Sequence, residues 1–231
     1  MTDQPAQFDA YAESYDDTVN RSIAFVGLRV DYFTRVKADY LLDILSRHLG
    51  DSRAIDLLDV GCGVANSHPL ITKRLGSVSG TDVSAECLAE AARRNPAGDY
   101  RAYAGARLPY EDGQFGAAVA TCVLHHVPPE QWRGFLAEMK RVVRPGGVTV
   151  IFEHNPLNPL ARRAVSNCAF DADAVLLSRR RTRALMDEAG FRVAEARSIL
   201  SIPVLGPRTR RIDRELGRLP LGAQYYVAGI A

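Results

Sequence analysis

Apolar residues along this 231-residue chain follow two spacings, one typical of strands and one typical of helices. Short apolar runs predict strands over residues 54–60, 77–83, 99–105 and 148–154, and a further strand within 114–127. Amphipathic stretches predict helices from Gly63 to residue 76, over 85–94 with Ser84 as N-cap, and over 129–143. Strands that alternate with helices in this way favour an α/β fold with a doubly wound, mostly parallel sheet.

Both ends of the chain depart from this alternation. Residues 30–50 have helical spacing and stop at Gly50. After residue 155 the pattern predicts a helix over 178–190, a strand over 191–202, an arginine-rich segment and a last strand over 223–231. Two strands in succession suit an antiparallel hairpin at the edge of the sheet. We therefore expect one domain with seven strands, the last of them antiparallel.

The composition excludes several classes of protein. Hydrophobic residues make up 47% of the chain and charged residues 24%, as in ordinary globular proteins. No apolar run approaches the length of a membrane span, and the polar, acidic N-terminus lacks the pattern of a signal peptide. The four cysteines are widely spaced without a CxxC pair, so we expect neither disulfides nor a bound metal. These features favour the cytoplasm.

The stretch "LLDVGCGVANSHPLI" (57–71) predicts a tight turn between a strand and a helix, where a ligand can approach backbone N–H groups. No Lys-Ser/Thr follows the glycines, which excludes a P-loop, and Asn66 stands where a dinucleotide fingerprint needs a third glycine. Asp82 ends the next strand, 21 residues after Gly61, where an acid can accept hydrogen bonds from ribose hydroxyls. The alternative for Asp82 is an acid at a helix N-terminus. A nucleoside-like ligand without phosphate is the favoured interpretation.

Four segments together resemble the class I S-adenosylmethionine-dependent methyltransferases, in the group of ubiquinone-type and small-molecule enzymes. They are "LLDVGCGVA", "GTDVS", "LPYEDGQFGAAVATCVLHHV" and "MKRVVRPGGVTVIFEH", within residues 55–155. The resemblance implies a Rossmann-like sheet with an antiparallel last strand and S-adenosyl-L-methionine as cofactor. It divides the single domain into an N-terminal helical lid (1–50), a cofactor-binding core (51–155) and a C-terminal substrate-side and edge-strand region (156–231).

The resemblance also implies which residues contact the cofactor. They are Tyr15, Asp59, Gly61, Cys62, Gly63, Asp82, Val83, Ala106, Arg107, Thr121 and Cys122. The glycine turn would lie under the methionine half, Asp82 would hold the ribose, and Ala106 and Arg107 would border the adenine. The sequence departs from the family pattern at Ala65, where a third glycine is common, and at Gly105 and Gly116, where aspartates are common. The Asp82 and glycine core remains intact.

Methyl transfer to a hydroxyl or a carbon acid needs a base, and histidine suits that role. The candidates are His125 and His126, in the loop after the fourth strand, and His154 at the end of the fifth strand beside Glu153. Either of the paired histidines could instead only shape the loop. For Glu153, a structural role as a capping acid is favoured over catalysis.

The acceptor is expected to be a small molecule. No Asn-Pro-Pro-Tyr signature follows the fourth strand, which favours oxygen or carbon over nitrogen. Residues 156–231 carry 13 arginines and seven acids, so an anionic or carrier-linked acceptor is possible, although a solvated helix face is the favoured explanation of the arginines. The near-neutral chain gives no sign of a nucleic-acid partner. Two alternatives stay open: an NAD(P)-dependent oxidoreductase, and a non-catalytic cofactor-binding protein of the same fold.

Overall fold

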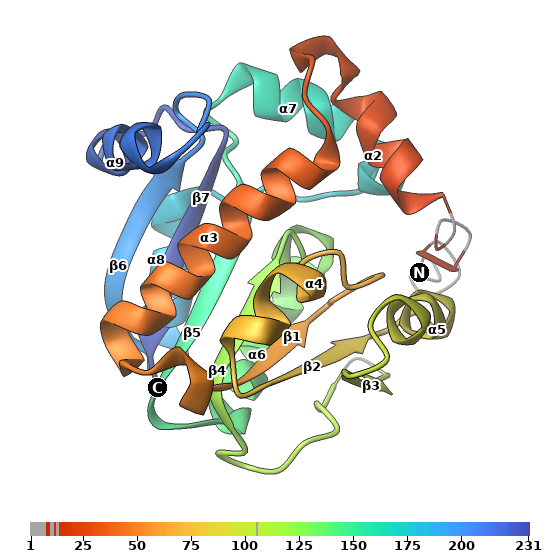
Figure 1. Ribbon diagram of the computed structural model, residues 1–231, viewed down its shortest axis with the longest axis vertical. Coiled ribbons are helices and arrows are strands. Elements are labelled where there is room, and N and C mark those ends of the chain that lie inside the picture. Colours follow the sequence, from red (N-terminus) through yellow and green to blue (C-terminus); the bar gives the residue numbers. More distant parts are fainter. Residues whose placement is uncertain (1–7, 10–11, 13, 105) are drawn as a thin grey trace.

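The computed structural model describes residues 8–9, 12, 14–104 and 106–231, and its centre is a seven-stranded sheet (Figure 1). The strands are β1 (Asp56–Val60), β2 (Ser77–Asp82), β3 (Asp99–Ala102), β4 (Phe115–Thr121), β5 (Val143–His154), β6 (Arg192–Ile199) and β7 (Gln224–Ile230). Their order in the sheet is β3-β2-β1-β4-β5-β7-β6. The first five strands pair in parallel, and β7 is antiparallel to both β5 and β6. The expected fold class is confirmed.

Helices cover both faces of this sheet. They are α2 (Tyr15–Ser22), α3 (Val30–Leu49), α4 (His68–Ile71), α5 (Ala85–Arg94), α6 (Trp132–Val142), α7 (Pro159–Ser166), α8 (Arg179–Glu188) and α9 (Pro207–Leu216). Side chains alternate between the two faces of each strand. Leu57 and Val119 therefore pack with α3, while their neighbours Leu58 and Ala118 pack with α6 and α8 on the opposite face. Figure 1 shows α3 running across one face of the sheet.

Local sequence signals explain where several helices begin and end. The Ser84 hydroxyl accepts a hydrogen bond from the Cys87 N–H (3.0 Å), which confirms Ser84 as the N-cap of α5. Asn158 caps α7 by accepting from the N–H groups of Leu160 and Ala161. Helix α3 ends at Gly50, whose φ of +81° favours glycine.

Three segments differ from the sequence-based expectation. The helix expected from Gly63 to residue 76 is reduced to α4 and a 3₁₀ turn (Thr72–Arg74), because Pro69 is tolerated only in the first helical turn. Residues 144–147 lie within β5 but bulge from it, since Val143 pairs with Phe115 and Val148 with Ala117. The arginine-rich segment between the last two strands forms helix α9. In the sheet, β7 lies between β5 and β6, so β6 is the edge strand.

The arrangement of the parallel strands decides where a ligand can bind. Strands β1, β2, β4 and β5 are parallel, so their carboxyl ends lie together along what we call the carboxyl edge of the sheet. The strand order reverses between β1 and β4, and open α/β sheets bind ligands at such a point. Helices α2 and α7 lie together above this edge (Figure 1). Helix α2, part of the predicted N-terminal lid, therefore lies above the carboxyl ends of these strands, and its role as a lid stays a prediction. Within the described residues, no helix combines the length and the apolar character needed to span a bilayer.

Candidate active site

The glycine turn after β1 has a backbone that glycine makes possible. Gly61 has a φ of +73°, and a Cβ atom there would lie 2.5 Å from Val123 Cγ2. The N–H groups of Gly61 and Cys62 donate to the carbonyl of Thr81 (2.7 and 3.1 Å), which ties the turn to β2. Gly63 has a φ of +51°, and its missing side chain leaves open space. The turn therefore exposes backbone that a ligand can approach closely.

Asp82 lies directly across this turn. Its Oδ2 accepts a hydrogen bond from the Gly63 N–H (2.8 Å) and its Oδ1 from the Ser84 N–H (3.0 Å). Burial raises the pKa of Asp82, although the two N–H donors oppose that shift. A carboxylate has about four acceptor positions. Asp82 can therefore hold the turn and still accept hydrogen bonds from a ligand.

A second acid at the turn has an unused acceptor. Asp59 Oδ2 accepts from the Ser67 hydroxyl (3.4 Å) and lies 3.3 Å from His68 Nε2. Within the described part of the chain, buried Asp59 Oδ1 has no hydrogen-bond partner. An unpaired buried carboxylate oxygen is costly, so a ligand group that donates to it would be stabilised.

A cavity of about 720 Å³ extends from this turn into the space beneath α2 and α7. Nine of the eleven predicted cofactor residues line it, namely Tyr15, Asp59, Gly61, Cys62, Gly63, Asp82, Val83, Thr121 and Cys122. Ala106 and Arg107 are exposed and do not line it, and Arg107 lies instead 3.8 Å from Asp112. Tyr103, which the motif did not indicate, lines the cavity near Asp82.

The far part of the cavity is an apolar chamber. Its walls come from α3, a 3₁₀ turn (Ala24–Val26), α7 and the loop after β6, and include Phe25, Val26, Phe33, Leu160, Val165 and Ile202. Tyr15 stacks on Phe170 with ring centroids 5.2 Å apart, which joins α2 to the segment after α7. This chamber suits a ligand whose surface is largely hydrocarbon.

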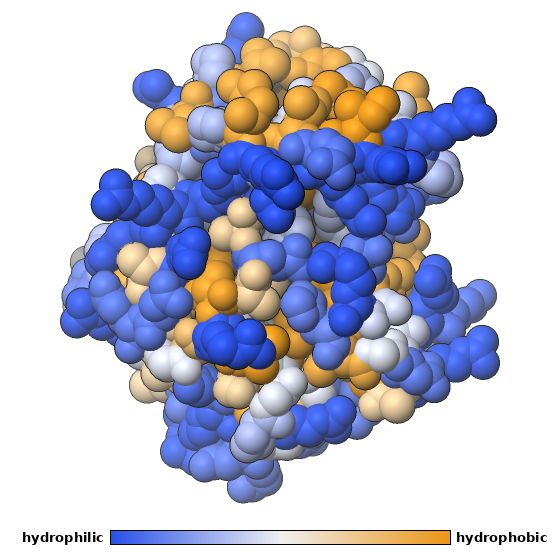
Figure 2. Space-filling view, turned by 90° about the vertical axis from the view of Figure 1, so that its left-hand side faces the viewer, coloured by the Kyte–Doolittle hydropathy of each residue, from blue (hydrophilic) through white to orange (hydrophobic). Residues whose placement is uncertain are grey.

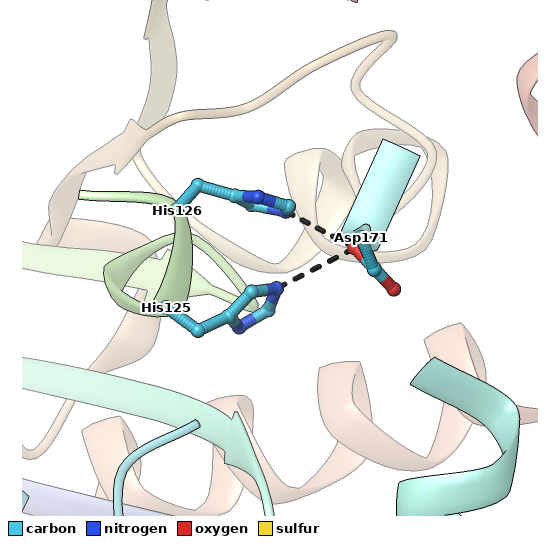
Figure 3. A group of neighbouring side chains, drawn as sticks. All are labelled: His125, His126 and Asp171. Carbon is cyan, nitrogen blue, oxygen red and sulfur yellow. Dashed lines mark ion pairs between the residues drawn. The ribbon is translucent and has the colours of Figure 1, made fainter. Parts of the chain in front are cut away.

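The three candidate histidines gather between the two parts of the cavity. His125 Nδ1 lies 2.5 Å from Glu153 Oε2, and its Nε2 lies 3.7 Å from Asp171 Oδ1. His126 Nε2 lies 3.2 Å from the same Asp171 oxygen, so both imidazoles point at one carboxylate (Figure 3). His154 lies beside them, with its ring centroid 5.5 Å from that of His125. All three line the cavity.

These contacts shift the pKa values of His125 and His154 in opposite directions. Burial opposes protonation of His125, but Glu153 and Asp171 raise its pKa well above the ordinary value. The two carboxylates thus favour the protonated form of His125, and its role as a base stays a prediction. Burial and the positive charge of His125 together lower the pKa of His154 to about 4. His154 is therefore neutral at pH 7 and is a weaker base than an ordinary histidine.

His125, His126 and Asp171 also have the composition of a metal-binding group, because their ligand atoms lie within 4.8 Å of one another. The ion pairs account for the same arrangement. Although burial opposes its ionisation, Asp171 has a lowered pKa because both histidines donate to it. Glu153, which is fully buried, also accepts the Leu124 N–H (2.8 Å). We therefore interpret the cluster as a buried ion-pair network.

Lys37 was missed by the sequence interpretation, although a signal was present. The chain has only three lysines, and this one falls on the apolar face of α3, four residues after Phe33 and four before Leu41. Its Nζ lies 4.0 Å from Cys122 Sγ, at the end of β4. Lys37 lines the cavity and makes no ion pair with any described residue. Asp171 was also missed, and no local motif marks it.

The C-terminal arginines serve partly internal roles. Arg210 Nη2 lies 2.8 Å from Asp39 Oδ2, and Arg214 pairs with Asp43, so α9 is fastened to α3. Arg179 donates to the carbonyl groups of Gly217 (2.7 Å) and Arg218. These contacts leave fewer arginines free to form a cationic patch for an anionic acceptor than the sequence alone indicates.

The comparisons with known proteins agree with this geometry. A family model described as a methyltransferase domain matches residues 58–151. The chain is 28% identical to a demethylmenaquinone methyltransferase of Beutenbergia cavernae over 92% of both chains. It is 30% identical to a 2-methyl-6-phytyl-1,4-hydroquinone methyltransferase of Synechocystis, over 43% of this chain and 32% of that one. For four further curated relatives, the chain spans between 33% and 66% of their length.

The fold also agrees with solved structures. A geranyl diphosphate C-methyltransferase of Streptomyces coelicolor superposes with a TM-score of 0.62 at 19% identity, covering 83% of this chain and 78% of that one. At this identity the likeness concerns the fold. Neither the family model nor these relatives support an oxidoreductase.

Proposed function

We propose that this chain is a class I S-adenosylmethionine-dependent methyltransferase that methylates an oxygen or carbon atom of a lipophilic small molecule carrying an ionisable hydroxyl. One observation carries the proposal. Lys37 Nζ lies 4.0 Å from Cys122 Sγ at the end of β4, and Gln224 Nε2 lies 3.7 Å from the same sulfur and 3.4 Å from His154 Nδ1. A cation and, through Gln224, a neutral imidazole thus flank the end of β4.

The residues at the glycine turn fit the cofactor. Asp82 would accept the ribose hydroxyls with its remaining lone pairs, and the unpaired Asp59 Oδ1 would accept from the ammonium group of the methionine half. Gly61 and Gly63 would allow close approach of the backbone. When bound, S-adenosylmethionine supplies a methyl group already activated on a sulfonium, so the protein chiefly has to align the acceptor and exclude water.

The charges in the chamber favour an oxyanion as acceptor. Lys37 stabilises negative charge on an acceptor oxygen and repels a protonated amine, whereas the charge of His125 is already balanced by Glu153 and Asp171. Gln224 Nε2 donates to His154 Nδ1 (3.4 Å), so the neutral ring carries its hydrogen on Nε2 and can donate it to the acceptor oxygen. The acceptor binds as the oxyanion, its hydroxyl proton having passed to solvent water. The negative charge then serves either O-methylation or, through an aromatic ring, C-methylation, after which the methylated ring carbon loses its proton to water and the ring regains aromaticity.

The named substrates of relatives support a lipophilic acceptor. Demethylmenaquinone and 2-methyl-6-phytyl-1,4-hydroquinone both combine a quinone-type ring with a long hydrocarbon chain. The chamber of this protein offers an apolar wall for such a chain and polar groups at one end for the ring.

The test is turnover of S-adenosylmethionine with matched acceptors, namely alkylated phenols and hydroquinones against amines with the same chains. We expect transfer to the phenols and hydroquinones only. Lys37→Met should lower kcat by roughly 10²–10³, as for loss of one oxyanion donor. Lys73→Met is the matched control, because Lys73 is exposed on the turn after α4. Preferred turnover of amines, or full activity of Lys37→Met, would contradict the proposal.

A further inference from the structure

Exposed leucines gather at the end of the molecule that carries α7. Leu157 and Leu160 are 67% and 54% exposed, and Leu219 and Leu221 are 47% and 60% exposed. The two segments that carry them are joined, because the Asn158 side-chain amide donates to the Leu221 carbonyl (2.9 Å). We call these four residues the leucine rim. Figure 2 shows hydrophobic side chains gathered at the upper end of the molecule, where α7 lies in Figure 1.

The leucine rim adjoins the cavity through Leu160. Leu160 is both exposed and part of the cavity wall, and Asn158, which holds the two segments together, lines the cavity as well. Phe25 and Val26 line it from the neighbouring 3₁₀ turn. The apolar surface outside is thus continuous with the apolar chamber inside. A monomer that binds only water-soluble ligands has no need for such an apolar mouth.

Exposed arginines accompany the leucine rim. They are Arg162 and Arg163 of α7, Arg208 and Arg211 of α9, and Arg218 beside Leu219. None of the five forms an ion pair with a described residue, in contrast to Arg210 and Arg214 on the inner side of α9. Only Glu215 adds an exposed acid to α9. The charge at this end is positive and available to an external anion.

We infer that this end of the molecule docks on a lipid bilayer that contains anionic lipids. The leucine rim enters the acyl region, the arginines meet the lipid phosphates, and a lipophilic acceptor passes from the bilayer into the chamber without crossing water. A bilayer fits better than a partner protein because the leucines are spread over α7 and two loops among arginines, as in interfacial anchors, instead of forming a flat apolar core. The acceptor's route rests on the proposed function; the docking itself does not.

The test is co-sedimentation of the full chain with vesicles, in the absence of cofactor and acceptor. We expect binding to vesicles of phosphatidylglycerol that is at least tenfold stronger than binding to phosphatidylcholine and that weakens as salt is raised. Leu157→Ser with Leu221→Ser should weaken binding at least tenfold. Leu70→Ser is the matched control, because Leu70 is also exposed (37%) but lies on α4. Circular dichroism checks that each variant is folded.

Two outcomes would overturn the inference. The first is equal, negligible sedimentation of wild type and the double variant with both kinds of vesicle. The second is a concentration-dependent dimer of the wild type that the double variant abolishes, since the leucine rim would then bind a second copy of the chain. Turnover of a short-chain, water-soluble acceptor separates this result from the proposed function. That turnover should be the same in wild type and the double variant, because neither Leu157 nor Leu221 lines the cavity.

Discussion

The buried pair of Glu153 and His125 allows a quantitative prediction from Glu153→Gln. Both side chains are at most 1% exposed, and Glu153 accepts from His125 Nδ1 (2.5 Å) and the Leu124 N–H (2.8 Å). Removal of one partner from a buried ion pair costs about 3–5 kcal/mol. Glutamine keeps an acceptor for Leu124 but loses the charge, so we expect a loss of about 3 kcal/mol. For a domain of this size that corresponds to roughly 6–12 °C in Tm.

The pH dependence of this loss follows from the two pKa shifts. Burial opposes the ionisation of Glu153, but His125 lowers its pKa, so this contribution to stability is present above the ordinary glutamate value and is lost as pH falls. The pKa of His125 is raised, so its contribution is full below about 6.5 and is lost as pH rises through the raised value. The difference between wild type and Glu153→Gln should therefore be largest between about pH 4.5 and 6.5.

Urea unfolding at pH 6 measures the loss directly, provided that the slope m is unchanged. Asp187→Asn is the control, because Asp187 forms an exposed pair with Arg183 and its loss should cost less than about 1 kcal/mol. A loss in Glu153→Gln no larger than in this control would refute the ion-pair interpretation. So would a difference that grows steadily above pH 8.

Three further predictions concern the two halves of the cavity. Gly61→Ala should lower stability and cofactor binding more than Gly63→Ala, because only the first Cβ meets an atom, at 2.5 Å; thermal unfolding compares them, and equal losses would contradict the clash. Asp82→Ala should weaken S-adenosylhomocysteine binding by about 10–100-fold in calorimetry, through loss of charged hydrogen bonds, while NADH binds to neither protein. With a pKa of about 4, His154 stays neutral, so the NMR signals of its ring protons should not shift between pH 7.5 and pH 5; a titration midpoint near 6.5 would indicate an ordinary histidine.

The sheet and the cofactor half could be predicted because their signals are local. The apolar run before Gly61 and the acid at the end of the next strand lie on short segments whose geometry depends on few other residues. The apolar pattern after Gly63 predicts a longer helix than α4, because the pattern does not reflect that Pro69 must lie in the first helical turn. The polar cluster could not be predicted, since Lys37, His125 and Asp171 come from segments far apart in the chain. Their meeting depends on how α3 and the segment after α7 close over the sheet.

The charges of the closed chamber also bear on the order of events in the proposed reaction. Glu153 and Asp171 are already paired with His125, whereas Lys37 has no carboxylate partner among the described residues. An anionic acceptor therefore gains the attraction of Lys37 on entry, and it gains more where water is excluded. Transfer of a methyl group from a cationic donor to an anionic acceptor removes both charges. The methylated product carries no negative charge and is no longer attracted by Lys37. The transfer itself therefore favours release of the product.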